Sequence, residues 1–188
     1  MARYLVGRYN NTWDFMTAYE KAQDGDTIEF EDDYYFEWPT DKEILINKSL
    51  NFVGHVVPKP NGNGMLYRNT IKASIKIISG VKVTFENLWF TINGDYTAIQ
   101  VVDGAEVNCK QVYFEIAIEQ NNKYFIFVNS HSKMVMENVG MTTPENCNAM
   151  IKILSSKLSI TNSTILAGVR VVDGSKISFD KVNLQIYN

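Results

Sequence analysis

The chain has 188 residues, enough for one domain with a sizeable core, and a net charge of −3 from 18 basic and 21 acidic residues. Nucleic-acid-binding proteins need an excess of basic residues, which this chain does not have, so we expect no nucleic-acid partner. Because the four arginines are scattered along the sequence, we also expect no groove for a polyanion. No secretion signal and no apolar run long enough to cross a bilayer is visible, which predicts a soluble protein without a membrane partner, in the cytoplasm or a phage particle.

The first predicted element is a helix over residues 13–23, capped by Thr12. Phe15, Ala18, Tyr19 and Ala22 follow the spacing of one apolar helix face. We expect this face to cover the first layer of the fold, as end caps do in repeat proteins. The sequence therefore predicts an N-terminal cap over residues 1–26 and a body over residues 27–188, together one structural domain.

Short strands and a loop follow the predicted helix. Thr27–Phe30, Glu43–Ile46 and residues 50–53 are predicted strands, since each is short, apolar and bounded by polar turn residues. Residues 58–64 hold two prolines, two glycines and two asparagines, which predicts an excursion or a flexible link.

The second half of the chain repeats a pattern of three short alternating runs. In the first copy these runs are Ile75/Ile77, Val83/Phe85 and Leu88/Phe90, and four further copies follow. The second residue of the first run falls at positions 77, 101, 128, 153 and 171, so the steps are 24, 27, 25 and 18 residues. Alternation with period two predicts strands with one buried face, and three strands per repeat predict a coil that returns to its starting edge.

Polar residues mark two corners of each predicted coil. One corner carries Ser79-Gly80, Asp103-Gly104 and their counterparts, residue types that tolerate a tight turn. The other corner carries a column of mostly amide side chains: Asn87, Gln111, Asn138, Asn162 and Lys181. The column is explained either by amides that bond along the stack or by the turn propensity of asparagine, and both interpretations predict stacked coils.

The opening of the chain resembles that of pectin-lyase-like proteins. The stretches KAQDGDTIEF and ILINKSLNFVGH carry the likeness, through an Ala-Gly-Asp-type turn before the first strand and a Lys-Ser-Leu stretch that ends in glycine; the matching residues are Ala22, Gly25, Asp26, Ile28, Ile46, Lys48, Ser49, Leu50 and Gly54. The resemblance implies an all-β, single-stranded, right-handed parallel β-helix with three short strands per coil and an N-terminal capping α-helix. Members of that superfamily include lyases, hydrolases, phage tail proteins and non-catalytic surface proteins, so the likeness does not select a function.

Aromatic side chains are the strongest ligand-binding candidates. Trp89 and Tyr113 fall in one outward column on consecutive coils, where flat exposed rings make a platform for a sugar or a protein. The competing interpretation is that a connecting loop folds over them. Tyr96 and Tyr124, at the ends of loops that follow the third strands, are further ligand-binding candidates.

Charged candidates are weaker. Lys152 and Arg170 adjoin in another outward column, where they could hold one carboxylate or phosphate or form a plain surface pair. No two carboxylates share an outward column of the repeat, and the acids left as catalytic candidates are Asp95, Glu119 and Glu145 in the loops.

Cysteine and histidine are too few to predict a metal or cofactor site. Cys109 and Cys147 form no CxxC motif and do not cluster with His55 or His131, so we expect no metal ligands and no cofactor. Cys109 falls in an alternating apolar stretch, which predicts a small core residue. One disulfide between the two cysteines is a second possibility.

Two functions from different classes fit these patterns. The preferred hypothesis is a non-catalytic structural or recognition module of a phage or cell-surface assembly that binds glycan or protein. Because no closing cap follows Leu184 and Ile186, we also expect a homo-oligomer, or a longer protein, joined through an open C-terminal coil. The alternative is a polysaccharide lyase or glycoside hydrolase that acts from the loop face.

Overall fold

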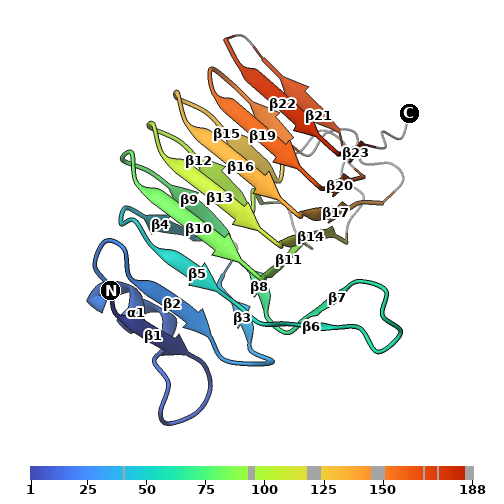
Figure 1. The fold of residues 1–188 in the computed structure, drawn as a ribbon. Helices are drawn as coiled ribbons and strands as arrows, with labels where there is room; N and C mark the ends of the chain where they lie inside the picture. The colour runs from blue at the N-terminus through green and yellow to red at the C-terminus, as the bar shows by residue number, and fades with distance from the viewer. Residues whose placement is uncertain are drawn as a thin grey trace.

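The protein is an all-β molecule of long parallel sheets, as predicted (Figure 1). The computed structural model describes residues 1–39, 41–92, 96–117, 124–144, 151–166, 168–172 and 174–184. Within these residues, strands that follow one another along the chain fall into three sheets, here called A, B and C, and the strands of each sheet pair in parallel register. This arrangement is that of a parallel β-solenoid.

Sheet A has eight described strands and holds the first strand of the chain. In spatial order they are β1 (Arg3–Val6), β2 (Thr27–Phe30), β5 (Asn51–Val53), β10 (Lys82–Glu86), β13 (Glu106–Lys110), β16 (Lys133–Glu137), β19 (Lys157–Thr161) and β22 (Lys176–Asp180).

In sheets B and C, as in sheet A, the order of the strands in space follows their order along the chain. The strands of sheet B are β3 (Tyr35–Glu37), β8 (Thr70–Lys72), β11 (Trp89–Ile92), β14 (Tyr113–Ile116), β17 (Gly140–Thr142), β20 (Thr164–Ile165) and β23 (Asn183–Leu184). Those of sheet C are β4 (Glu43–Ile46), β9 (Ser74–Ile77), β12 (Ile99–Val101), β15 (Ile126–Val128), β18 (Ile151–Ile153) and β21 (Val169–Val171).

The core consists of like side chains stacked from strand to strand. Ile77, Val101 and Val128 are in register on sheet C and have no exposed surface. Aromatic rings continue the stack inside the solenoid, with 5.2 Å between the ring centroids of Phe90 and Phe114. The period-two runs therefore predicted the buried face of the strands correctly in the first four copies of the repeat.

The polar corners are left-handed turns. Backbone φ is positive at Asn87, Gln111 and Asn138, near 59°, 51° and 55°, and the same holds at Asn162 and Lys181. In this column the backbone N–H of each corner donates to a carbonyl of the next strand in the stack, as Gln111 does to Glu137 at 2.9 Å. The turn interpretation of the column is therefore confirmed, and among the described residues no bond joins the amide side chains to one another.

The N-terminal helix is shorter than predicted. α1 spans Phe15–Lys21, and its N-cap is Asp14, whose carboxylate accepts a hydrogen bond from the Thr17 N–H at 3.0 Å. Thr12 is not the cap because Trp13 bonds back to β1, its N–H donating to the Leu5 carbonyl at 2.8 Å.

The apolar face of α1 is buried as predicted. Phe15 and Ala18 are 6% and 0% exposed, and the Phe15 ring centroid lies 4.7 Å from that of Phe36. At the other end of the helix, Lys48 Nζ donates to the carbonyls of Tyr19, Glu20 and Ala22 at 2.8–3.0 Å. This lysine therefore fixes the helix to the chain segment that enters β5.

Three strands, β1, β3 and β8, and one hairpin were not predicted. β1 pairs in parallel with β2 within the residues expected to form only a cap. The loop expected at residues 58–64 is the tip of an antiparallel hairpin, formed by β6 (Val56–Pro58) and β7 (Met65–Tyr67), which projects from the body of the molecule (Figure 1).

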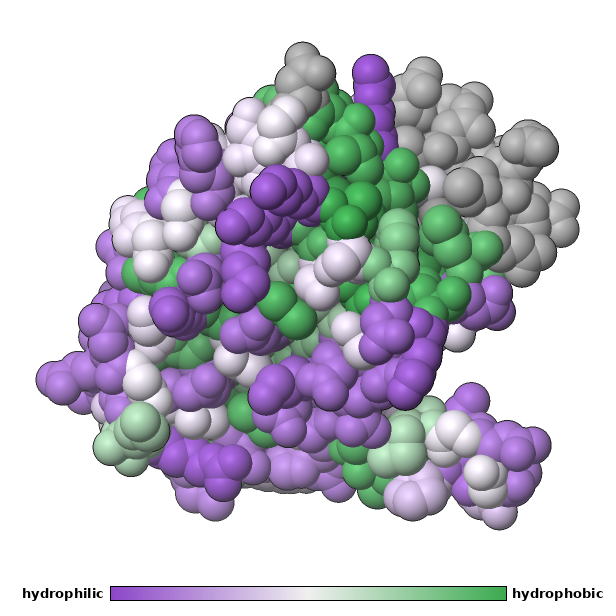
Figure 2. All heavy atoms as spheres, turned by 45° about the horizontal axis from the view of Figure 1, so that its top comes forward, coloured by the Kyte–Doolittle hydropathy of each residue, from purple (hydrophilic) through white to green (hydrophobic). Residues whose placement is uncertain are grey.

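The described strands at the C-terminal end carry exposed apolar side chains. Val171, Phe179 and Leu184 are 46%, 45% and 38% exposed, although their counterparts one layer earlier are buried. Figure 2, in which this end is turned toward the viewer, shows a hydrophobic area there. No helix in the described part of the chain combines the length and the apolarity that a membrane span needs.

Candidate functional site

A groove of about 500 Å³ lies between the hairpin and sheet B. Its lining residues come from β7, from two corners and from the strands that follow them: Met65, Tyr67, Gln111, Tyr113, Asn138 and Gly140. Gln111 and Asn138 stand in the groove because the left-handed corner precedes β14 and β17 directly. None of the six side chains is charged at neutral pH, so the groove offers aromatic rings and amides.

The aromatic column predicted from the sequence is present, but it is not a flat platform. Trp89 and Tyr113 are in register on neighbouring strands, with ring centroids 5.9 Å apart and ring planes at 83°. Tyr67 covers the column from the hairpin, 6.0 Å from Tyr113 between centroids. Both column residues are half-buried and their rings meet edge to face, so they do not form a flat exposed platform; the segment that contacts the column is the hairpin and not one of the loops that follow the third strands.

The absence of a side chain at Gly140 leaves room for the Tyr113 ring. A Cβ at position 140 would lie 2.6 Å from Cδ2 of that ring, closer than real contacts allow. The Tyr113 hydroxyl is held by a hydrogen bond of 2.9 Å with Thr142 Oγ1. The Tyr113 ring therefore lies across the neighbouring strand β17, where Gly140 leaves room for the ring and Thr142 holds its hydroxyl.

The groove is uncharged at neutral pH because of the residue types that line it, and burial makes ionisation of Tyr67 still less favourable. Burial raises the pKa of Tyr67, and the neighbouring Tyr113 raises it further. The phenol therefore stays protonated and available as a hydrogen-bond donor. The indole N–H of Trp89, which does not line the groove, is buried and has no partner in the described part of the chain.

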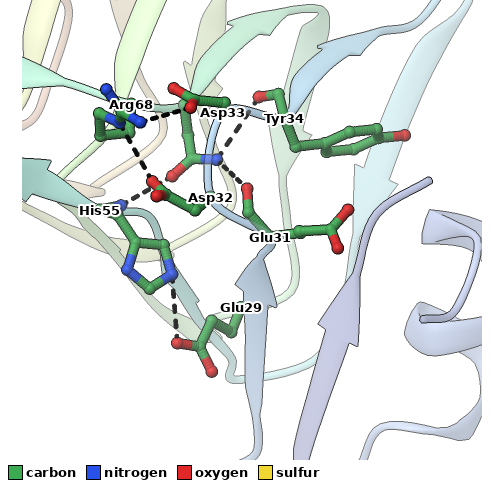
Figure 3. A network of polar contacts seen from close by, with 8 residues as sticks. Glu29, Glu31, Asp32, Asp33, Tyr34, His55 and Arg68 are labelled. Carbon is green, nitrogen blue, oxygen red and sulfur yellow. Dashed lines mark hydrogen bonds and ion pairs between the residues drawn. The ribbon is translucent and has the colours of Figure 1, made fainter. Parts of the chain in front are cut away.

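The hairpin is anchored on both sides of its base, by a histidine–carboxylate contact on one side and by arginine–carboxylate ion pairs on the other (Figure 3). Before β6, His55 Nε2 lies 3.3 Å from Glu29 Oε1 on β2. After β7, Arg68 Nε lies 3.3 Å from Asp32 Oδ1, and its Nη2 contacts the Asp33 carboxylate. The wall of the groove that carries Met65 and Tyr67 is thereby tied to the turn after β2.

Asn69 reinforces this anchor from the interior. It has no exposed surface, its Oδ1 accepts the His55 N–H at 2.7 Å, and its Nδ2 donates to the Glu31 carbonyl at 2.6 Å (Figure 3). The partners in this network lie 14 to 38 positions apart in the sequence, so no local pattern could have revealed it.

The structure also brings together the predicted residues Tyr124, Lys152 and Arg170. Lys152 and Arg170 are in register on β18 and β21. The Lys152 ammonium lies 4.9 Å from the Tyr124 ring centroid, and Arg170 Nη1 donates to the Tyr124 hydroxyl at 2.9 Å. The tyrosine therefore joins the two cations on sheet C.

The remaining predicted residues do not form a site in the described residues. Tyr96 is only 9% exposed and donates its hydroxyl proton to the Thr91 carbonyl at 3.0 Å, so most of its surface is buried within the protein. Asp95, Glu119 and Glu145 lie outside the described residues. Across the residues that are described, no group of three histidines, cysteines or acids is arranged to hold a metal ion.

The fold and the groove define the class of protein to which this chain belongs: a parallel β-solenoid with an aromatic groove beside one of its sheets. No protein-family model matches the sequence, and no curated protein matches it.

Proposed function

We propose that this protein is a non-catalytic recognition module of a phage or cell-surface assembly, and that it binds an uncharged stretch of glycan in the groove beside the hairpin. We propose further that the solenoid is a right-handed, pectin-lyase-like β-helix with three strands per coil and with α1 as its N-terminal cap. Support comes from the order of strands, which visit sheets C, A and B in turn from β9 onward. Further support comes from Phe15, which packs on Phe36 at the end where β1 and β3 lie.

The lining of the groove is the observation that carries the glycan proposal. Aromatic rings provide apolar faces for the C–H groups of a sugar, and amides both donate and accept hydrogen bonds with its hydroxyls. Tyr67 and Tyr113 supply the rings, while Gln111 and Asn138 supply the amides. Its volume of about 500 Å³ suits a short segment of a polymer.

A glycan array followed by titration tests this proposal. We expect a neutral glycan to bind, and Tyr67→Ala to weaken binding at least tenfold, about 1.4 kcal/mol, because one wall of the groove is lost. The matched control is Leu66→Ala, which removes an exposed side chain from the same strand and should leave affinity unchanged. Unchanged affinity in Tyr67→Ala, or no glycan bound by the wild type, contradicts the proposal.

The same polysaccharides test the enzymatic alternative. A lyase or hydrolase that uses Asp95, Glu119 or Glu145 releases reducing ends or unsaturated products, whereas a recognition module leaves the polymer intact. If cleavage is found, its survival in a variant with all three acids changed to alanine excludes these acids as the catalytic groups.

A further inference from the structure

Three lysines form a row on sheet A, away from the residues of the groove. Lys133, Lys157 and Lys176 occupy the first positions of β16, β19 and β22 and are in register from strand to strand. Neighbouring strands lie about 4.8 Å apart, so the three exposed ammonium groups follow one line.

No acid neutralises this row in the described part of the chain. The next residue of the column, Glu106 on β13, lies 3.7 Å from Lys82 and forms its ion pair there. Like charges directly opposite one another on neighbouring strands repel. The row is therefore a local concentration of positive charge on a protein whose net charge is negative.

A hollow of about 240 Å³ lies beside the row, at the corner that leads into these strands. Lys157 and Lys176 line it together with His131, Ser132 and Ser156 from neighbouring layers. Ser132 is only 1% exposed, and its hydroxyl has no hydrogen-bond partner in the described residues. The corner therefore holds an unsatisfied polar group as well as two cations.

The backbone N–H groups of His131 and Ser132 at this corner are already used in hydrogen bonds within the protein. The His131 N–H donates to the Ser155 carbonyl at 3.0 Å, and the Ser132 N–H donates to Ser156 Oγ at 3.1 Å. What the hollow offers to a ligand is thus chiefly the ammonium groups of Lys157 and Lys176. Ammonium groups bind oxyanions through short, charge-assisted hydrogen bonds.

We infer that this hollow binds a tetrahedral oxyanion, a sulfate or a phosphate, held chiefly by Lys157 and Lys176. The anion sits between two like charges, so its binding removes the repulsion within the row. It is either a free ion or an ester group on a larger molecule, since both present the same oxygens. This site is independent of the groove and of the glycan proposed for it.

Calorimetric titration with sulfate and with phosphate, at constant ionic strength in chloride, tests the inference. We expect saturable binding to the wild type and at least a tenfold loss of affinity in Lys157→Gln/Lys176→Gln. The control is Lys42→Gln/Lys59→Gln, which removes the same charge from exposed positions outside the hollow and should bind as the wild type does. Because all four side chains are exposed, both variants should keep the wild-type circular dichroism spectrum.

Dextran sulfate and unmodified dextran distinguish the two sources of the anion. Binding of dextran sulfate well above that of the free ions, lost in Lys157→Gln/Lys176→Gln, assigns the site to esters on a polymer. Equal affinity for free sulfate and dextran sulfate, counted per site, assigns it to the free ion. Equal binding by the double variant and the wild type, or no saturable binding of any of these sulfates and phosphates, overturns the inference.

Discussion

The two faces of one strand differ in how well they tolerate a charged substitution, because one face is buried and the other is partly exposed. Val107 on β13 has no exposed surface and lies in register between Val83 and Met134, whereas its neighbour Asn108 points to the other face and is half-exposed. A carboxylate at position 107 would be buried without a partner, which costs several kcal/mol, and a typical domain has only about 5–15 kcal/mol to lose.

We therefore expect Val107→Asp to prevent folding, while Asn108→Asp leaves the fold intact. Circular dichroism and the yield of soluble protein measure both effects. A soluble Val107→Asp variant with an unchanged melting temperature would contradict the buried position of this side chain.

Asp26 makes the stability of the N-terminal strands depend on pH. Its carboxylate accepts hydrogen bonds from the backbone N–H groups of Gln23 and Ala2, and these bonds hold its pKa below the ordinary value. The stabilisation is therefore present above the ordinary pKa of about 3.9 and is lost as the pH falls through the lower pKa of the folded state. We expect Asp26→Asn to melt below the wild type at neutral pH, and the gap to close on acidification; a gap independent of pH would refute this role.

Among the elements, the β6–β7 hairpin depends most on contacts distant in sequence. In the described structure its two strands pair only with each other, and its base is attached to β2 by the His55–Glu29 contact and to the turn after β2 by the ion pairs of Arg68. Partly exposed ion pairs are worth about 0–1 kcal/mol, so they set the position of the hairpin more than the stability of the whole molecule.

Hydrogen exchange measures this anchoring. In Arg68→Gln we expect faster exchange of backbone amides within the hairpin, no change on β10 and β13, and a melting temperature close to that of the wild type. Arg170→Gln, on sheet C, serves as the control and should leave the hairpin amides unaffected. Equal exchange in the hairpin of both variants would show that Arg68 does not position it.

The sequence predicted the strands of the part of the chain in which one short pattern recurs. It did not predict contacts that occur only once and join residues distant in sequence. Strands from Ser74 onward were predictable because each layer repeats the same alternation and the same turn residues. β1 was missed because its partner β2 lies beyond a helix, and the helix start was misplaced because Trp13 bonds to β1. For the groove, register placed Trp89 beside Tyr113, but the covering residue Tyr67 comes from a hairpin whose position rests on non-local ion pairs.

At the scale of the whole molecule, the two ends of the solenoid differ. Phe15 of α1 covers apolar side chains near the N-terminal end, whereas Val171, Phe179 and Leu184 are 38–46% exposed near the other. Strand edges and apolar surface of this kind favour association with another chain. We therefore propose that two copies associate through β21, β22 and β23, where these apolar side chains are exposed.

Light scattering after size-exclusion chromatography tests this association on the intact natural chain. We expect twice the monomer mass for the wild type and the monomer mass for Phe179→Lys, because a charge in the contact opposes burial. Leu45→Lys, which changes an exposed apolar residue on β4, should remain dimeric. A monomer mass for the wild type would count against self-association.

The stacking of in-register strands also has a mechanical consequence. Among the described strands, those of sheets A, B and C pair with the strands of the adjacent layers, and β21, β22 and β23 each pair on one side alone. Tension applied at the C-terminus would peel the molecule one turn at a time, and a force–extension trace would show a series of similar steps in place of one large rupture.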